Sequence, residues 1–386
     1  MSQRTDPYAA AHKPCPVCGA DAGESLIKLR YALFDDLDMP GEKMLTGCPK
    51  CGMIYDEVAF SEEKLAEYYR RNEHYAASST GGTGGVSDDN TARYERILRA
   101  LAPKRSGMIL DVGCGQGGFV DYCRRRGFEA VGIEPSTCSR AAALALGLEV
   151  FESFNAFRAA YPEAPVAAIV LSHVLEHLLD PLSFLQQAVQ LAPGADVYLE
   201  TPDASSYLAT TSVRWREVYF EHVQHFREGT LAAIAQRAGV HARETGACSF
   251  SPAQTDTRCC FLAGTADGMA RPVETLDRCA ESHVGSLPSV PQVLLPKETG
   301  RLALWGISQY AMLLMGSRPE LAGIGRLFDA SPAKIGRTIR GVRIESPKAL
   351  LSLDADTVLL LPRSYYTDTM LAHLAAIDYK GDYLTV

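Results

Sequence analysis

The stretch Met108-Ile-Leu-Asp-Val-Gly-Cys-Gly-Gln-Gly-Gly-Phe119 decides the fold of this 386-residue chain. Its first five residues are apolar apart from one acid and end at a glycine, which predicts a short buried strand. Residues 119–126 have helical spacing, so a glycine-rich turn joins this strand to a helix. Such a turn lets the backbone approach a ligand closely, and the amino end of a helix offers free N–H groups. We therefore expect a ligand-binding α/β unit.

Two acids near this loop indicate which cofactor it binds. Gly113, Gly115 and Gly118 fit the dinucleotide pattern G-x-G-x-x-G, so the glycines alone do not choose between NAD and S-adenosylmethionine. Asp111 would point toward phosphate in a dinucleotide complex, whereas it suits a ligand with an ammonium group. Glu134 ends the next predicted strand, about twenty residues on, where an acid holds a ribose. The stretch from Asp111 to Gly117 resembles the first motif of class I S-adenosylmethionine-dependent methyltransferases, which implies that the cofactor is held by Asp111, Gly113, Gly115, Gly117 and Glu134.

Composition sets the outer limits of the interpretation. The apolar content of 47% is enough to bury large cores, and the length predicts two or three domains. A net charge of −8, with no aromatic and basic patch, disfavours nucleic acid as a partner. The first residues lack an apolar signal core, and no apolar run reaches the length of a membrane span. We therefore expect a cytoplasmic protein that acts on a small molecule without a membrane partner.

Two cysteine pairs precede the glycine loop. They are Cys15-Pro-Val-Cys18-Gly19 and Cys48-Pro-Lys-Cys51-Gly52. Four thiolates complete a tetrahedral zinc site, and the glycines let backbone N–H groups turn toward the sulfurs. A redox dithiol is the competing interpretation, but a doubled motif fits it poorly. We predict structural zinc without a catalytic role, since four protein ligands leave no open position, and an insertion between the pairs, such as a hairpin through residues 26–45.

Predicted helices and strands alternate around and beyond the loop. Helices are expected at 61–72, 90–101, 119–126 and 138–146, and strands at 148–151, 167–171 and 197–200. This alternation predicts an α/β fold, a parallel sheet with helices on both faces and ligands at the carboxyl ends of its strands. Residues 247–251 and 258–264 are candidates for a final antiparallel pair. Strand ends place Glu152 and Ser153 near adenine, and Ser172, His173 and His177 at the site.

The residues that could carry chemistry follow in Tyr219-Phe-Glu221-His222. Histidine is the usual base near neutral pH, a neighbouring carboxylate can raise its basicity, and a tyrosine can hold a developing oxyanion. The same residues could also simply satisfy a buried polar network. Upstream, Tyr75 precedes a glycine cluster at 81–85, which either connects two elements or closes over a ligand.

The order of these motifs resembles the sugar C-methyltransferases that act on nucleotide-linked 4-keto-deoxysugars. The resemblance covers nearly the whole chain, including the double cysteine knuckle, the glycine loop and the Tyr-x-Glu-His segment. It implies that His222 is the base and that the residues around it are Tyr75, His177, Tyr219 and Glu221. The chain departs from that family at Phe220, which is usually histidine, at His225, which is usually tyrosine, and at Ser172-His-Val-Leu-Glu-His177, which usually reads Asn-Asn-Val-x-Ala-His.

The composition shifts from about residue 265 onward. A helix is expected from 272 to 284, a proline-marked linker follows, and strands are expected at 301–306, 357–361 and 383–386. This smaller parallel unit has only one glycine after its first strand, so we expect it to cover substrate and not to bind a cofactor. The predicted domains are 1–60 (zinc binding), 61–265 (S-adenosylmethionine binding) and 266–386 (Rossmann-like).

The resemblance and the residues together imply C-methylation. A base removes a proton next to a ketone, tyrosine hydroxyls stabilise the enolate, and the carbanion attacks the sulfonium methyl. The alternatives are an O-methyltransferase with the same cofactor, an NAD-dependent sugar oxidoreductase, and a non-catalytic protein that binds zinc and S-adenosylmethionine.

Overall fold

The computed structural model divides into two compact units. The first contains Met1–Leu26, Leu45–Ala209 and Glu221–Ser286, and the second contains Ile27–Met44, Thr210–Phe220 and Leu287–Val386. The predicted division into three domains stays a prediction. The structure describes residues 13–21, 23–57, 61–71, 84–85, 88–101, 107–205, 218–251, 254–269, 289–290, 292–295, 301–364 and 366–386.

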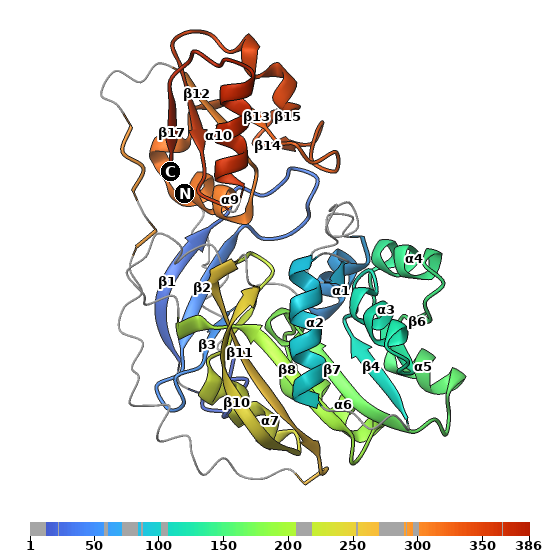
Figure 1. Ribbon diagram of the computed structural model, residues 1–386. Coiled ribbons are helices and arrows are strands. Elements are labelled where there is room, and N and C mark those ends of the chain that lie inside the picture. Colours follow the sequence, from blue (N-terminus) through green and yellow to red (C-terminus); the bar gives the residue numbers. More distant parts are fainter. Residues whose placement is uncertain are drawn as a thin grey trace. The chain divides into compact units, whose positions relative to one another are not determined.

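A seven-stranded sheet forms the centre of the first unit (Figure 1). Its order is β10-β11-β8-β7-β4-β5-β6. Five neighbouring strands run parallel, namely β8, β7, β4, β5 and β6. The last two strands, β10 and β11, are antiparallel, as predicted for the final pair. The predicted α/β fold is therefore confirmed. The bounds are β4 (Met108–Val112), β5 (Ala130–Ile133), β6 (Val150–Phe151), β7 (Val166–Ser172), β8 (Asp196–Pro202), β10 (Val240–Ser251) and β11 (Gln254–Ala266).

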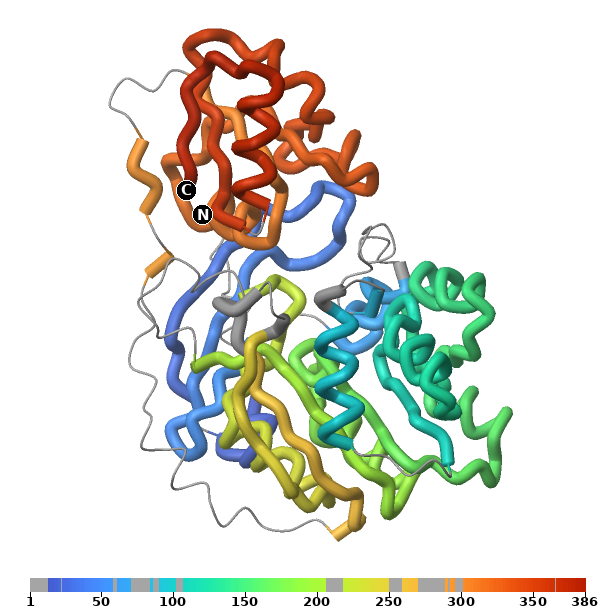
Figure 2. Tube along the Cα trace, in the orientation of Figure 1, coloured from blue at the N-terminus to red at the C-terminus, as the bar shows by residue number. Residues whose placement is uncertain are grey.

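Helices bury both faces of this sheet. Along β4, Leu110 and Val112 join one apolar cluster while Ile109 joins the other, because successive side chains of a strand point to opposite faces. Helices α2 (Asp88–Leu101), α3 (Gly118–Arg125) and α4 (Thr137–Ala145) cover the Ile109 face. Helices α5 (Phe154–Ala160), α6 (Pro181–Leu191) and α7 (Glu228–Arg237) cover the other. The α2 and α3 traces lie side by side (Figure 2), and Tyr94 packs on Phe119 with ring centroids 5.5 Å apart.

A second, smaller sheet connects the cysteine segment to the Glu221-His222 segment. Its strand order is β1-β2-β3-β9, and β1 and β2 are neighbours, as a hairpin between the cysteine pairs requires. Strand β9 pairs with β3 in antiparallel register, Ile54 opposite His225 and Tyr55 opposite Gln224. Three residues after His222, the chain is therefore fixed to the segment that follows the second cysteine pair. The bounds are β1 (Glu24–Arg30), β2 (Glu42–Gly47), β3 (Ile54–Asp56), β9 (Gln224–His225) and the neighbouring helix α1 (Glu62–Arg71).

The second unit is built on a six-stranded sheet of order β14-β15-β13-β12-β16-β17. All neighbours run parallel except β14, which pairs with β15 in antiparallel register. The predicted parallel unit and its three strands are confirmed, whereas the helix expected at 272–284 lies outside the described residues. The bounds are β12 (Arg301–Trp305), α9 (Gln309–Ser317), β13 (Ile324–Phe328), β14 (Thr338–Ile339), β15 (Val342–Glu345), β16 (Thr357–Leu361), α10 (Thr367–Ala376) and β17 (Tyr383–Thr385), with 3-10 turns at Pro319–Leu321 and Pro347–Ser352.

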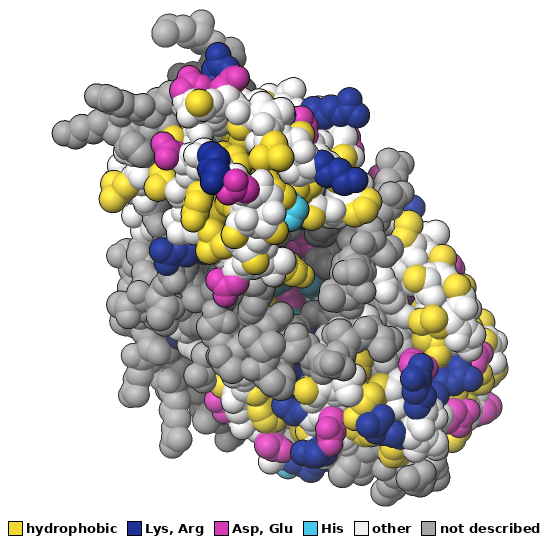
Figure 3. Space-filling view, turned by 45° about the horizontal axis from the view of Figure 1, so that its top comes forward, with side chains coloured by type: hydrophobic (Ala, Val, Ile, Leu, Met, Phe, Trp, Pro, Cys, Tyr) yellow, Lys and Arg dark blue, Asp and Glu magenta, His cyan; other side chains and the backbone are white. Residues whose placement is uncertain are grey.

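The described surface is mixed in charge. Lysine and arginine side chains on the face shown in Figure 3 are interspersed with acidic ones. Within the described part of the chain, no helix combines the length and the apolar character that crossing a bilayer requires.

Candidate functional site

The glycine loop between β4 and α3 has the backbone conformation that its sequence predicts. Gly113, Gly115 and Gly117 have φ angles of +72°, +56° and +80°, in the left-handed region that favours glycine. A Cβ at Gly113 would lie 2.6 Å from Cγ2 of Val174, and one at Gly117 would lie 2.5 Å from Cδ1 of Leu148. Side chains at these positions would therefore strain the loop and clash with its neighbours.

A small cavity lies at the carboxyl end of β4, beside this loop. Its lining includes Asp111 from the strand, Ser172 from the end of β7 and Arg93 from α2. Burial raises the pKa of Asp111 to about 7, against the attraction of the Arg93 guanidinium. One acid and one guanidinium in the same cavity match the ammonium and carboxylate of an amino-acid group, the end of the expected cofactor. Sequence reasoning missed Arg93. Its position could have indicated a role, because Arg93 lies between Asn90 and Ile97 on the buried face of a predicted helix, where a charged residue is unusual.

Glu134 is held over the glycine loop by backbone groups. Its Oε2 accepts a hydrogen bond from the Gly115 N–H at 2.8 Å, and its Oε1 accepts one from the Ser136 N–H at 2.7 Å. Burial raises the pKa of Glu134, opposed by these two hydrogen bonds. The carboxylate is thus fixed where the sequence placed a ribose acceptor.

The remaining predicted cofactor contacts have other local roles in the structure. Ser153 caps α5, its hydroxyl accepting a hydrogen bond from the Ala156 N–H at 3.2 Å. The Glu152 side chain is 69% exposed and lies 3.8 Å from the Arg140 guanidinium. Both residues follow β6, at the carboxyl edge of the sheet, so their placement near adenine stays a prediction.

The described end of the glycine cluster at 81–85 packs against the cofactor loop. A Cβ at Gly84 would lie 2.7 Å from the Cys114 carbonyl oxygen. The Gly85 carbonyl accepts hydrogen bonds from Asn90 Nδ2 at 2.9 Å and from the Tyr94 hydroxyl at 2.8 Å. This end of the cluster is therefore anchored to α2 beside the cavity. Tyr75 lies outside the described residues.

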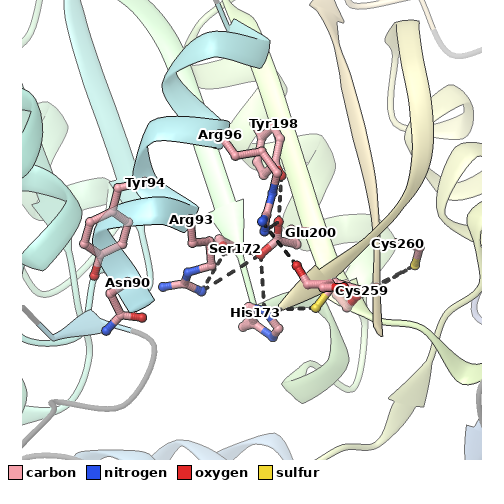
Figure 4. A network of polar contacts seen from close by, with 12 residues as sticks. Asn90, Arg93, Tyr94, Arg96, Ser172, His173, Tyr198, Glu200, Cys259 and Cys260 are labelled. Atoms are coloured by element: carbon pink, nitrogen blue, oxygen red, sulfur yellow. Dashed lines mark hydrogen bonds and ion pairs between the residues drawn. The ribbon is translucent and has the colours of Figure 1, made fainter. Parts of the chain in front are cut away.

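A buried ionic network shares Arg93 and Ser172 with the cavity lining (Figure 4). Its centre is Glu200 of β8, which is 0% exposed. The carboxylate lies 2.8 Å from Arg96 Nη2, 4.0 Å from Arg93 Nη1 and 3.3 Å from His173 Nε2, and it accepts a hydrogen bond from the Tyr198 hydroxyl at 2.6 Å. Burial alone would raise the pKa of Glu200, but His173 and the two arginines hold it well below its usual range. The network fixes α2, β7 and β8 relative to one another.

His173 turns the chain out of β7. Its φ of +59° is left-handed, a conformation that is uncommon outside glycine. The imidazole lies between two carboxylates, with Nδ1 3.2 Å from Glu176 Oε1 and Nε2 3.3 Å from Glu200 Oε1. Although burial opposes protonation, hydrogen bonds to the two carboxylates raise the pKa of His173. His173 therefore links the strand end that follows Ser172 to the network around Glu200.

Three of the five predicted catalytic residues gather in the first unit. The His177 and His222 rings lie edge to face with centroids 4.8 Å apart. Tyr69 of α1 shares a 2.8 Å hydrogen bond with His177 Nδ1, and the Tyr68 hydroxyl donates to Glu221 Oε1. Both tyrosines lie in the helix that the sequence predicts at 61–72, and nothing in the sequence placed them in the site. The structure shows that α1 supplies hydroxyl partners to both a histidine and a carboxylate of the cluster.

The other two predicted catalytic residues are not part of this group as described. Tyr219 belongs to the second unit, where its carbonyl oxygen accepts a hydrogen bond from Lys43 Nζ at 3.0 Å. Tyr75 has no described position. His225, whose participation the sequence left open, is buried in β9 opposite Ile54.

The four predicted zinc ligands converge. The sulfurs of Cys15, Cys18, Cys48 and Cys51 all lie within 4.8 Å of one another. The two knuckles have the same backbone pattern: the Gly19 N–H donates to the Cys15 carbonyl and the Gly52 N–H to the Cys48 carbonyl, each at 2.8 Å. Four thiols in two matching turns fit a tetrahedral structural zinc ion.

Two arginines at the ends of α7 connect these knuckles to the large sheet. Arg227 donates a hydrogen bond to the Gly52 carbonyl, and Arg237 donates one to the Val17 carbonyl. Each knuckle is therefore hydrogen-bonded to an arginine at one end of α7, and the strand after the second knuckle, β3, is also paired with β9.

A family model, two relatives and one solved structure show what this chain is similar to. Residues 88–244 match a family model described as a methyltransferase domain. The chain is similar to the ubiquinone biosynthesis O-methyltransferase of Paracidovorax citrulli (strain AAC00-1), 26% identical over 171 residues, which covers 40% of this chain and 72% of that protein. It is also similar to the ajmaline N-methyltransferase of Rauvolfia serpentina, 26% identical over 170 residues, covering 37% of this chain and 58% of that protein. Among solved structures, the N-methyltransferase NodS from Bradyrhizobium japonicum WM9 in complex with S-adenosyl-L-homocysteine aligns with a TM-score of 0.40 and 15% identity, over 51% of this chain and 97% of that one.

Proposed function

We propose that this chain, an S-adenosylmethionine-dependent methyltransferase, methylates a carbon next to the keto group of a nucleotide-linked deoxysugar. The observation that carries the proposal is the edge-to-face pair of rings of His177 and His222. Tyr69 is hydrogen-bonded to His177, and Tyr68 is hydrogen-bonded to Glu221, the chain neighbour of His222. A carboxylate next to a buried histidine is the arrangement expected of a general base.

The cofactor has a set of complementary groups in the first unit. Asp111 would hold its ammonium, Arg93 its carboxylate and Glu134 its ribose hydroxyls, and Ser172 lines the same cavity as Asp111 and Arg93. We place the adenine at Glu152 and Ser153, after β6. Bound S-adenosylmethionine supplies an electrophilic methyl group on a sulfonium.

The chain's own residues supply the proton transfer. His222 removes the proton from the carbon beside the ketone, and the electron pair of that C–H bond moves into an enolate. Glu221 stabilises the imidazolium that forms, and it is itself held by the Tyr68 hydroxyl. The enolate carbon then forms a bond to the methyl group as the sulfur–methyl bond breaks, so S-adenosylhomocysteine leaves. Tyr219 and Tyr75 are the proposed hydroxyl donors to the enolate oxygen.

The four cysteines hold a structural zinc ion in this proposal. A zinc ion on the four cysteines would hold the segment that leads into β3, β3 pairs with β9, and β9 begins two residues after His222. The ion takes no part in the reaction, yet it sets the position of the base.

The test of the proposed function is the position of the transferred methyl group. The protein is incubated with a nucleoside-diphosphate 4-keto-6-deoxyhexose and S-adenosylmethionine labelled with carbon-13 in the methyl group. The proposal predicts a methyl carbon bonded to carbon in the product NMR spectrum, and its loss in His222→Asn. A methyl group bonded to oxygen would contradict it.

A second candidate is O-methylation of a hydroxyl group. It is favoured by the names of the similar proteins, an O-methyltransferase and an N-methyltransferase, whose acceptor atoms are not carbon. Here His222 or His177 would deprotonate the hydroxyl. The same labelling experiment separates the two candidates.

A further inference from the structure

A buried carboxylate next to the proposed base has no role in the mechanism above. Glu176 follows β7 in the 3-10 turn Leu175–His177, and it is 1% exposed. Its Oε2 oxygen has no hydrogen-bond partner among the described residues. Its Oε1 oxygen lies 3.2 Å from Nδ1 of His173, whose other ring nitrogen lies 3.3 Å from the Glu200 carboxylate. A buried carboxylate with so few partners is costly and calls for a further cation.

Two imidazoles lie beside this carboxylate. One ligand atom each from Glu176, His177 and His222 all fall within 4.8 Å of one another. The two segments that carry them are joined by a backbone hydrogen bond from the Val223 N–H to the Glu176 carbonyl at 2.8 Å. The three side chains are therefore brought together by a fixed backbone contact.

The hydrogen bond that His177 makes is one that metal-binding histidines also make. Its Nδ1 lies 2.8 Å from the Tyr69 hydroxyl, which can accept the Nδ1–H. The other nitrogen, Nε2, then carries the lone pair that a metal ion needs. Histidines that bind metals characteristically donate their second ring nitrogen to such a partner.

A neighbouring group of similar composition lacks these features. His173, Glu200 and Cys259 also offer ligand atoms within 4.8 Å of one another. However, Arg96 lies 2.8 Å and Arg93 4.0 Å from the Glu200 carboxylate. Two guanidinium groups already compensate that acid, and they would repel a metal cation.

We propose that Glu176, His177 and His222 bind a divalent transition-metal cation of the zinc class, with one coordination position open. Two imidazoles and one carboxylate are a common ligand set of open zinc sites. The consequence for activity rests on the proposed function: a cation on His222 occupies the lone pair that would take the carbon-bound proton. His222 cannot bind the cation and accept the proton at the same time, so the cation inhibits C-methylation.

The test is a cobalt titration of the full chain, isolated with one zinc ion in the four-cysteine site. We expect one further Co²⁺ to bind per chain, with the weak visible bands of nitrogen and oxygen ligands. Intense sulfur-to-cobalt absorption alone would mean exchange at the cysteines, and it would overturn the proposal, as would the absence of binding.

Variants assign the site. Glu176→Gln keeps the shape of the side chain and should abolish binding of the second ion, and His177→Asn should do the same. Glu149→Gln, an exposed acid elsewhere in the unit, is the matched control and should bind as wild type does. Because S-adenosylhomocysteine binds in the separate cavity at Asp111, unchanged binding of this ligand shows that a variant has folded. Second-site binding that persists in both variants would overturn the assignment.

The activity measurement is independent of these titrations. Zinc added beyond one equivalent should inhibit the C-methylation assay, and a chelator too weak to empty the cysteine site should restore it. A chain that binds the second cation and never methylates carbon would refute the proposed function while leaving the metal site established.

Discussion

Replacing Glu200 with glutamine should destabilise the first unit without changing its shape. The substitution removes one negative charge from a fully buried position and leaves Arg96, Arg93 and His173 facing a neutral amide. Breaking a buried ion pair by removing one partner costs about 3–5 kcal/mol. Arg96 is 27% exposed and can be partly hydrated once orphaned, whereas Arg93 is 2% exposed and cannot. We therefore expect a loss near the lower end, about 3 kcal/mol.

Urea unfolding followed by far-ultraviolet circular dichroism measures this loss. With a denaturant dependence of about 3 kcal/mol per molar urea, the midpoint should fall by about 1 M. Glu149→Gln makes the same chemical change on an exposed acid and should shift the midpoint little. An unchanged midpoint in Glu200→Gln would refute the reasoning, because it would mean that the charges around Glu200 do not need their partner.

The difference between wild type and Glu200→Gln should also depend on pH. Because the pKa of Glu200 is held below its usual range in the folded chain, its contribution is present above the unfolded pKa of about 4.3. This contribution is lost as the pH falls toward the folded pKa, so the two proteins should converge in acid. A gap that widens on acidification would contradict this sign.

Three further predictions concern the site. Burial raises the pKa of Asp111 to about 7. The affinity for S-adenosylhomocysteine should therefore fall as the pH drops below 7, by up to about tenfold per pH unit. Calorimetry of Asp111→Asn should show weak binding that does not depend on pH in this way. Cys51→Ser should lose zinc and lower methyl transfer by about tenfold or more, while calorimetric binding of S-adenosylhomocysteine should persist because the proposed cofactor cavity is lined by other residues. Tyr69→Phe removes one hydrogen bond to His177, worth about 1 kcal/mol, and should lower kcat about fivefold with the KM for S-adenosylmethionine unchanged. The control Tyr161→Phe, which removes a hydroxyl hydrogen bond to Glu149, should leave both constants as they are.

The sequence predicts those features that depend on local residue patterns. The strand, loop and helix from Met108 to Arg125 follow from an apolar run, three glycines with positive φ and helical spacing. The cysteine knuckles follow from their own spacing, since each turn closes within six residues. Both are short-range features that need no knowledge of the tertiary fold.

The features that sequence reasoning missed depend on partners far apart in the chain. Arg96 and Glu200 are 104 positions apart, and Tyr68 and Glu221 are 153 apart, so no spacing rule connects them. The pairing of β3 with β9 is equally hidden, because each strand contributes only two paired residues. Such networks leave one local signal in the sequence, a polar residue at a helix position where the spacing predicts burial. Arg93 is the clearest example.

The exchange of a carbon-bound proton tests the central claim most directly. The protein is saturated with S-adenosylhomocysteine in deuterium oxide and given a nucleoside-diphosphate 4-keto-6-deoxyhexose, so that no methyl transfer can follow. The account predicts that wild type exchanges the proton next to the ketone faster than a protein-free control, and that His222→Asn does not. Exchange that is no faster than the control, or equal in the variant, would contradict the assignment of His222 as the base that prepares a carbon for methylation.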